Sequence, residues 1–410
     1  MSEQIFAADL VLPISATPIR DGAMLVRDGC IVAVGKLDEV REESPDAEVR
    51  RFSGAAVIPG AVNAHAHLGF RREDAPEGGT FSGWLSRLIE RLPEKEAWTP
   101  EAARNSAQEA IEAGTTYMVE SSPYGECLPQ LAESGMAGAV HAEFFPHELG
   151  SPEEAVEFIM NKTQELKKGL PERVDAQVSV HSPYTVDPES SRLAAHRTRE
   201  KGERLAIHLS ESQEEVEFVR EGTGGLADIF GSNEWGGVGV SPVRYAQDIE
   251  LLASRTIAAH LATDVSEEDS ETLARTDTAV AHCPRSNYFL GCGVSPIPRM
   301  LERGVRVGMG TDGLWSSLSM NLFEETLFAV ELHGFDGATG LRLATLEGAR
   351  ALGVEEEVGS LENGKWADLA VVETAPSGED PEREILEAAA QGGVIATVAG
   401  GDLIYNQVEA

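Results

Sequence analysis

The sequence has few cysteines and no long apolar run. Its 410 residues include four cysteines, Cys30, Cys127, Cys283 and Cys292, and no Cys-x-x-Cys pair. This number and spacing exclude a disulfide framework. No apolar segment approaches the roughly 20 residues of a membrane-spanning helix, and residues 1–9 carry acids rather than the basic start of a signal peptide. We therefore expect a soluble protein with reduced thiols in the cytoplasm, without a membrane partner.

Basic residues are also scarce. Lys and Arg total 33 against 69 Asp and Glu, only seven of the basic residues are Lys, and the formal net charge is −36. Such a surface repels nucleic acid and anionic membranes, which excludes both as partners. An acidic, Lys-poor surface suits a cytoplasm of high salt, because screening removes the self-repulsion that opens a compact state.

Apolar segments that end in polar or small residues recur through the middle of the chain, with helical patterns such as 100–113 and 153–168 between them. A strand is predicted in each of residues 57–61, 116–120, 137–143, 176–180, 205–207, 256–259, 278–281 and 305–309. Eight strands alternating with helices predict an α/β protein built on a (β/α)8 TIM-type barrel.

Both ends of the chain alternate apolar and polar residues around Gly and Asp turns, as in residues 367–372 and 394–405. This pattern predicts strands rather than helices. We expect residues 1–56 and 355–410 to form one small β-sandwich domain, and residues 57–354 to form the barrel.

Two histidines stand one residue apart, His65 and His67, after the apolar run 55–58 and the pair Pro59-Gly60. Residues i and i+2 of a strand project to the same side, so both imidazoles can point at one ion. The pair alone is weak evidence, because two histidines at this spacing also occur as hydrogen-bonded core residues.

Further polar residues follow later predicted strands: His208 after the fifth, His260 after the sixth and Asp312 after the eighth. Active sites of such barrels lie at this end, and the first strand neighbours the eighth in a closed barrel. His65, His67, His208 and Asp312 together make a donor set suited to zinc or a similar divalent ion. Each taken singly is better explained as an ordinary polar residue.

A divalent ion in such a site lowers the pKa of water towards neutrality. Glu211, three residues after His208, is then placed to carry a proton to a leaving group. Its alternative role is that of a carboxylate at a helix start, favoured by the helix dipole.

Taken in order, these residues resemble the amidohydrolase superfamily over nearly the whole chain. The segments that carry the resemblance are VIPGAVNAHAH (57–67), HSPYT (181–185), HLSE (208–211), His260, HCPRSN (282–287), GTD (310–312) and GSLENGKWAD (359–368). Binuclear members usually bridge two metals with a carbamylated Lys after strand four, where this chain has His181 instead. The resemblance therefore implies one divalent ion, expected to be Zn²⁺, with Fe²⁺ or Mn²⁺ as alternatives.

The His-x-x-Glu form of strand five is similar to the branch that deaminates purines and related heterocycles. That resemblance implies that Glu211 is the proton shuttle, that His260 orients the attacking hydroxide or stabilises the tetrahedral intermediate, and that Asp312 also accepts the proton of water. A homodimer is usual for the family.

Within this branch, GTFSGW (79–84), RSN (285–287) and LGCG (290–293) resemble the aminodeoxyfutalosine deaminases, which act on an adenine nucleoside on a route to menaquinone. The resemblance implies that His181 reaches the ribose hydroxyls and that Trp84 and Asn287 contact the substrate. Arg285 is the expected partner of the substrate carboxylate, with Arg71 and Arg72 as rivals.

Other interpretations of the function remain open at this point. The same mechanism could act on S-adenosylhomocysteine, methylthioadenosine or guanine, or remove chloride from a triazine. A catalytically inactive structural homologue would be expected to lack metal ligands or the proton shuttle, and none is missing. A plain barrel with an acidic ligand-binding mouth predicts no stoichiometric metal.

The acidic composition predicts a salt response. The melting temperature should rise as KCl is raised from dilute buffer to molar concentration, because screening weakens the repulsion among the 69 acidic side chains. Thermal unfolding across a KCl series measures this. A melting temperature that stays flat or falls contradicts the expectation of a salt-loving host.

Overall fold

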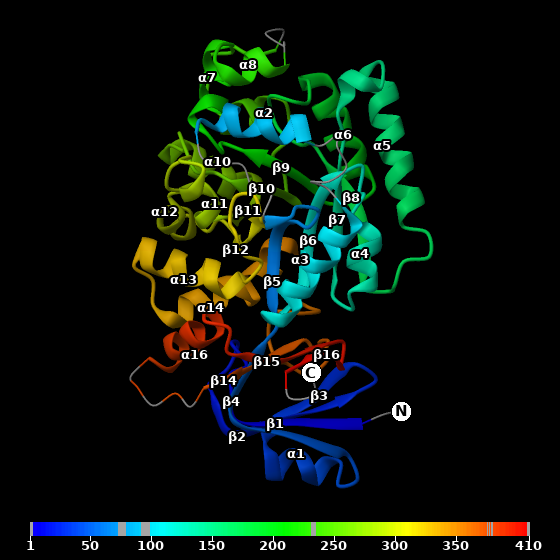
Figure 1. Ribbon diagram of the computed structural model, residues 1–410, viewed down its shortest axis with the longest axis vertical. Helices are drawn as coiled ribbons and strands as arrows, with labels where there is room; N and C mark the ends of the chain where they lie inside the picture. The colour runs from blue at the N-terminus through cyan, green and yellow to red at the C-terminus, as the bar shows by residue number, and fades with distance from the viewer. Residues whose placement is uncertain are drawn as a thin grey trace.

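The computed structural model describes residues 3–72, 79–91, 99–230, 235–374, 376, 378 and 380–407. Its strands form two sheets, one of seven strands and one of nine. Figure 1 shows the seven-stranded sheet at one end of the molecule, where blue N-terminal strands lie beside red C-terminal strands. The two ends of the chain therefore form one small domain, as predicted.

The small sheet has the order β16-β15-β14-β4-β1-β2-β3, and all its neighbours are antiparallel except β1 and β4. Its strands are β1 (Glu3–Val11), β2 (Ile19–Arg27), β3 (Cys30–Lys36), β4 (Glu48–Pro59), β14 (Leu369–Glu373), β15 (Val394–Ala399) and β16 (Asp402–Asn406). The pairing of β14 with β4 joins the distant parts of the sequence, and buried apolar residues pack on both faces of the sheet.

The larger sheet has the order β12-β11-β10-β9-β8-β7-β6-β5-β13, and every neighbouring pair is parallel. Its strands are β5 (Ala61–His67), β6 (Thr115–Pro123), β7 (Ala137–Glu143), β8 (Val174–Ser179), β9 (Leu205–Leu209), β10 (Thr256–His260), β11 (Ala279–His282), β12 (Val307–Met309) and β13 (Asp312–Gly313). Because β13 continues the chain from β12 and pairs with β5, the ends of the sheet meet and the predicted (β/α)8 barrel is confirmed.

The first predicted barrel strand is wrong. Residues 57–59 belong to β4 of the small sheet, so the domain division predicted after residue 56 falls inside that strand. The barrel begins at β5, which contains His65 and His67 rather than preceding them. Gly60 separates the two strands, and a Cβ there would lie 2.1 Å from Oγ1 of Thr116.

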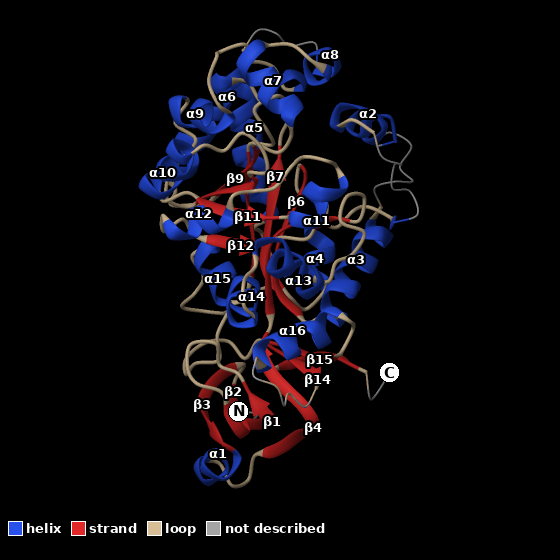
Figure 2. Ribbon diagram, turned by 90° about the vertical axis from the view of Figure 1, so that its left-hand side faces the viewer, coloured by secondary structure: helices blue, strands red, loops and turns tan. Residues whose placement is uncertain are grey.

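Helices surround the barrel strands, as Figure 2 shows. They are α2 (Phe81–Arg91), α3 (Pro100–Glu112), α4 (Leu128–Glu133), α5 (Pro152–Leu166), α6 (Pro188–Glu200), α7 (Gln213–Glu221), α8 (Gly225–Phe230), α9 (Pro242–Asp248), α10 (Glu267–Thr276), α11 (Pro284–Phe289), α12 (Ile297–Glu302), α13 (Leu322–His333), α14 (Gly337–Ala344), α15 (Leu346–Leu352) and α16 (Pro381–Ala390). The remaining helix, α1 (Leu37–Glu43), packs on the small sheet, and η3 (Pro146–Glu148) is a single 3-10 turn. Helices α2, α7 and α8 lie at the end of the molecule opposite the small sheet (Figure 1).

The range 355–410 expected for the small domain includes helix α16. In the structure, Ile385 and Leu386 share a buried cluster with Phe323 of α13 and with Val372 of β14, so this helix contacts both the barrel helices and the small sheet. Among the described residues, no helix is both long and apolar enough to span a bilayer.

The junction at Gly60 generates a stability prediction. Gly60→Ala should lower the free energy of unfolding by about 1–3 kcal/mol, because the new methyl group overlaps the buried Thr116 side chain. Gly35→Ala is the matched control, since its Cβ would meet only ordinary contacts of 3.4 and 3.6 Å. Urea unfolding of both variants measures the difference in the free energy of unfolding. Equal values for the two variants would refute the steric explanation for glycine at this junction.

Candidate active site

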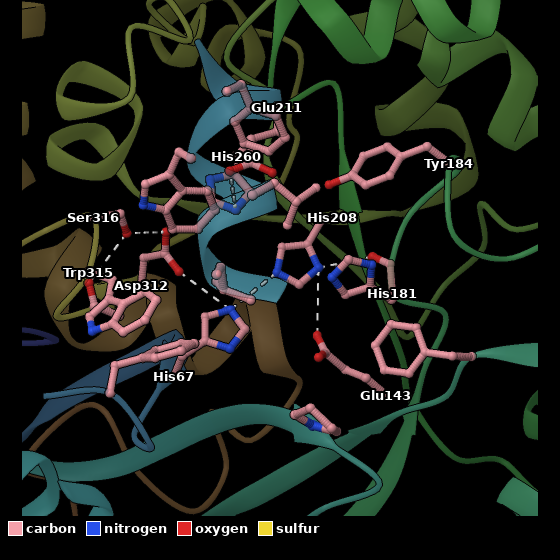
Figure 3. A pocket seen from close by; sticks show the side chains of 18 residues that line it. His67, Glu143, His181, Tyr184, His208, Glu211, His260, Asp312, Trp315 and Ser316 are labelled. Carbon is pink, nitrogen blue, oxygen red and sulfur yellow. Dashed lines mark hydrogen bonds and ion pairs between the residues drawn. The ribbon is translucent and has the colours of Figure 1, made fainter. Parts of the chain in front are cut away.

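Four side chains meet at the carboxyl ends of the barrel strands. His65 and His67 come from β5, His208 from β9 and Asp312 from β13. Nε2 of His67 lies 3.3 Å from Nε2 of His208 and 3.4 Å from Oδ1 of Asp312, while Nε2 of His65 lies 3.7 Å from the same oxygen. Figure 3 shows the His67, His208 and Asp312 side chains turned towards one another. The structure thus brings together all four predicted metal ligands.

The hydrogen bonds of Nδ1 determine the tautomer of two of these histidines, His67 and His208. Nδ1 of His67 lies 2.6 Å from the carbonyl oxygen of Ser121, and Nδ1 of His208 lies 2.9 Å from that of His181. A carbonyl only accepts hydrogen bonds, so each Nδ1 carries the proton and each Nε2 presents a lone pair inward. Nε2 of His65 is buried without a hydrogen-bond partner among the described residues.

Burial keeps the imidazoles of His65 and His208 neutral. It lowers the pKa of His65 and of His208 well below the ordinary range, and the neighbouring imidazoles lower both further. A neutral imidazole offers a lone pair at neutral pH, which is the state that binds a metal. Three converging lone pairs, one of them on an unpartnered buried nitrogen, with one carboxylate fit a divalent ion such as zinc.

Asp312 is held on its outer side by two hydroxyls. Ser286 and Ser316 both donate to Oδ2, which leaves Oδ1 directed at the histidines. Burial acts to raise the pKa of Asp312, but His260, His67 and the two hydroxyls outweigh it and hold the pKa below its usual value. The carboxylate therefore stays ionised inside the barrel.

Glu211 and His260 lie beside this donor set. Oε1 of Glu211 is 3.6 Å from Nε2 of His260, whose Nδ1 is 3.0 Å from Oδ1 of Asn287. Burial, with Asp312 and Glu215 as further causes, raises the pKa of Glu211 well above its ordinary value. A carboxyl group that keeps its proton near neutrality is suited to general acid catalysis.

These residues open into a pocket with about 730 Å³ of empty space, counted to its solvent mouth. Its lining includes Glu143, His181, Glu211 and His260 together with six aromatic side chains: Phe70, Phe81, Trp84, Phe145, Tyr184 and Trp315. Of the substrate contacts expected from the sequence, Trp84 and His181 therefore do line the cavity. A concave, mostly apolar pocket with a few convergent polar groups is the usual form of a small-molecule site.

Arg285 and Asn287 are outside this lining as far as the structure describes it. Nη1 of Arg285 lies 3.0 Å from Oε2 of Glu324 on α13. Oδ1 of the buried Asn287 accepts a hydrogen bond from Nδ1 of His260, while its Nδ2 has no hydrogen-bond partner among the described residues. Their positions do not support the expected substrate contacts. Arg72, one of the rivals of Arg285, forms an ion pair with Glu109.

Sequence reasoning did not pick out two further buried carboxyl groups at this site, those of Glu143 and Glu215. Glu143 ends β7 and lines the pocket, although the sequence offered the same signal for it as for Glu211, a polar residue at a strand end. Glu215, in the first turn of α7, accepts the backbone N–H groups of Ser210 and Glu211 at 2.8 Å each. It thereby fixes the backbone that carries Glu211, and no sequence pattern distinguishes it from its acidic neighbours on α7.

Comparison with known proteins places this site in a family. The model of the amidohydrolase family matches residues 56–404, and that of the imidazolonepropionase-like composite domain of bacteria matches residues 22–47. The 5-methylthioadenosine/S-adenosylhomocysteine deaminase of Symbiobacterium thermophilum is 30% identical over 99% of this chain and 94% of its own length. That of Nitratidesulfovibrio vulgaris is 31% identical over 95% of this chain and 88% of its own.

Solved structures agree with these sequence matches. An adenosine deaminase from Xanthomonas campestris, with bound zinc, has a TM-score of 0.84 and 26% identity over 99% of this chain and 93% of its own. The aminofutalosine deaminase of Helicobacter pylori also has a TM-score of 0.84, at 24% identity over 98% of this chain and 99% of its own, which shows the shared fold. With a family model matched over most of its length and the expected donor set assembled, this chain is an enzyme of the amidohydrolase family.

Proposed function

We propose that the protein is a metal-dependent deaminase that hydrolyses the exocyclic amino group of an adenine nucleoside. The observation that carries this proposal is the buried Glu211 carboxyl, whose pKa is raised and which lies 3.6 Å from His260 beside the four-donor set. The relatives named as methylthioadenosine/S-adenosylhomocysteine and adenosine deaminases support the same reaction.

Each polar residue has a distinct part in this reaction. His65, His67, His208 and Asp312 would hold a divalent ion, most simply one Zn²⁺, which would lower the pKa of a bound water. Oδ1 of Asp312 would accept a proton from the attacking water, and Nε2 of His260 would orient that water. Glu211 would donate its proton to the ring nitrogen next to the attacked carbon. Asp312 would then pass the water proton to the amino group, which departs as ammonia, and the remaining hydroxyl proton would return to Glu211.

The pocket lining bears on which nucleoside is used. Its aromatic side chains offer stacking surfaces for a purine, and among its described residues there is no Lys or Arg. Because Arg285 is paired with Glu324, the basis for a carboxylated substrate is weakened. We therefore favour an uncharged nucleoside of the adenosine or methylthioadenosine kind. Aminodeoxyfutalosine on the menaquinone route, S-adenosylhomocysteine, guanine and a chlorinated triazine belong in the assay panel.

Three further proposals accompany this function: a homodimer, a location in the cytoplasm and a salt-rich host. An inactive structural homologue is disfavoured because no metal donor or proton shuttle is missing. Ammonia release and the adenine-to-hypoxanthine absorbance change, followed in high salt across the substrate panel, test the activity. An absence of turnover on every adenine compound would refute the nucleoside assignment.

Glu211→Gln should lower kcat by about 10²- to 10⁴-fold, because the amide cannot donate the acidic proton. Metal content should stay at the wild-type value, since Glu211 is not a ligand in this scheme. The raised pKa also predicts that wild-type kcat holds at neutral pH and falls as the pH rises through that pKa and the acid form is lost. Glu221→Gln, at the exposed end of α7, is the control and should behave as wild type.

Removal of metal by dialysis against a chelator should abolish deamination and lower the melting temperature, because the converging buried donors lose their shared partner. One equivalent of Zn²⁺ per chain should restore both properties, with Fe²⁺ and Mn²⁺ as comparisons. Elemental analysis alongside the assay gives the stoichiometry. Full activity in metal-free protein would overturn the ligand assignment.

A further inference from the structure

Glu143 is a buried pocket residue to which the reaction scheme assigns no role. It ends β7, is 3% exposed and lines the cavity, yet Oε1 has no hydrogen-bond partner among the described residues. Nδ1 of His208 lies 3.8 Å from this oxygen, and the proton of that nitrogen is directed at the carbonyl of His181. Leaving a buried polar group unpaired costs about 1–3 kcal/mol, so a partner from outside the chain is expected.

The position of Glu143 defines which part of a substrate can reach it. Nε2 of His208 faces the donor set, whereas Nδ1 of the same ring faces Glu143. In Figure 3, Glu143 and Glu211 accordingly lie on opposite sides of the His208 ring. A base that receives its proton from Glu211 would therefore present another part of the molecule to Glu143.

His181 completes this second polar region. Its Nδ1 is engaged by the hydroxyls of Ser182 and Thr185 at 3.0 and 2.8 Å, which fixes the ring. The ring lines the pocket beside that of His208, with the two centroids 5.0 Å apart. The His181 ring also contacts the rings of Phe145 and Tyr184, with centroid distances of 5.4 and 6.1 Å, and all three residues line the pocket with Glu143.

We propose that Glu143 is a specificity-determining residue that accepts hydrogen bonds from the ribose hydroxyls of the nucleoside. This inference rests on the proposed function. A carboxyl oxygen accepts a hydroxyl proton whether or not the group is ionised, and its two oxygens match two vicinal hydroxyls. The described lining supplies no Lys or Arg to pair with Glu143, so a neutral donor from the substrate satisfies it.

A comparison of kcat/KM for adenosine and 2′,3′-dideoxyadenosine tests this assignment. It uses the wild type and the variants Glu143→Gln and Glu143→Leu. Wild type should prefer adenosine by on the order of 100-fold in kcat/KM, because a site built to bind a hydroxyl rejects the analogue that lacks it. Glu143→Leu should lower kcat/KM for adenosine by tens of fold, mainly through KM, and change that for the dideoxy compound by less than about threefold. Glu143→Gln should fall between them, since its amide oxygen still accepts.

The exposed Glu126→Gln is the control for loss of a carboxylate near this end of the barrel and should match wild type. Equal losses on both substrates in the Glu143 variants would overturn the proposal. So would a second metal equivalent per chain that Glu143→Gln removes, because Glu143, His181 and His208 would then form a metal site.

A binding measurement separates this inference from the reaction itself. Calorimetric titration of wild type with inosine and 2′,3′-dideoxyinosine needs no turnover. Tighter binding of inosine that disappears in Glu143→Leu supports the assignment even if no adenine nucleoside is deaminated, an outcome that would refute only the proposed function. Equal binding of both ligands by wild type would refute the role of Glu143.

Discussion

The pairing of β13 with β5 is the constraint on which the whole site depends. It sets Asp312 opposite Ala66 and Gly313 opposite His67, and so brings the carboxylate of the last barrel strand to the imidazoles of the first. Glycine suits position 313 because a Cβ there would already lie 3.1 Å from the ring of Phe70 and 3.2 Å from Cβ of His67. The same pairing therefore closes the barrel and places three of the four donors, His65, His67 and Asp312, beside one another.

Burial then acts in opposite senses on bases and acids. It lowers the pKa of His65 and raises that of Glu211, since the charged form is disfavoured in both cases. The result is a set of neutral lone pairs beside a neutral proton donor, which is the combination that hydrolysis of an amidine requires. Asp312 escapes this rule because His260 and His67, and after them the hydroxyls of Ser286 and Ser316, outweigh the effect of burial on its pKa.

The sequence was sufficient to predict the barrel and the candidate donor set because the ends of strands can be recognised in it. All eight predicted barrel strands overlap observed strands, and seven of them lie on barrel strands, whereas residues 57–61 fall mainly on β4 of the small sheet. The sequence does not show which sheet an apolar run joins. For that reason, residues 57–59 were assigned to the barrel although they belong to the small sheet. Nor does a position after a strand fix where a long side chain points: Arg285 turns to Glu324 on α13, although it follows β11 as expected.

The described pocket lining and the chain as a whole are both poor in basic side chains. Glu143, Glu211 and Asp312 line a cavity that shows no described Lys or Arg, inside a chain with a formal charge of −36. Recognition there must come from aromatic stacking and hydrogen bonds rather than from ion pairs with the substrate. High salt weakens ion pairs by screening, whereas it leaves apolar contacts intact or strengthens them. A pocket that recognises its ligand in this way is expected to lose little affinity as the salt concentration rises.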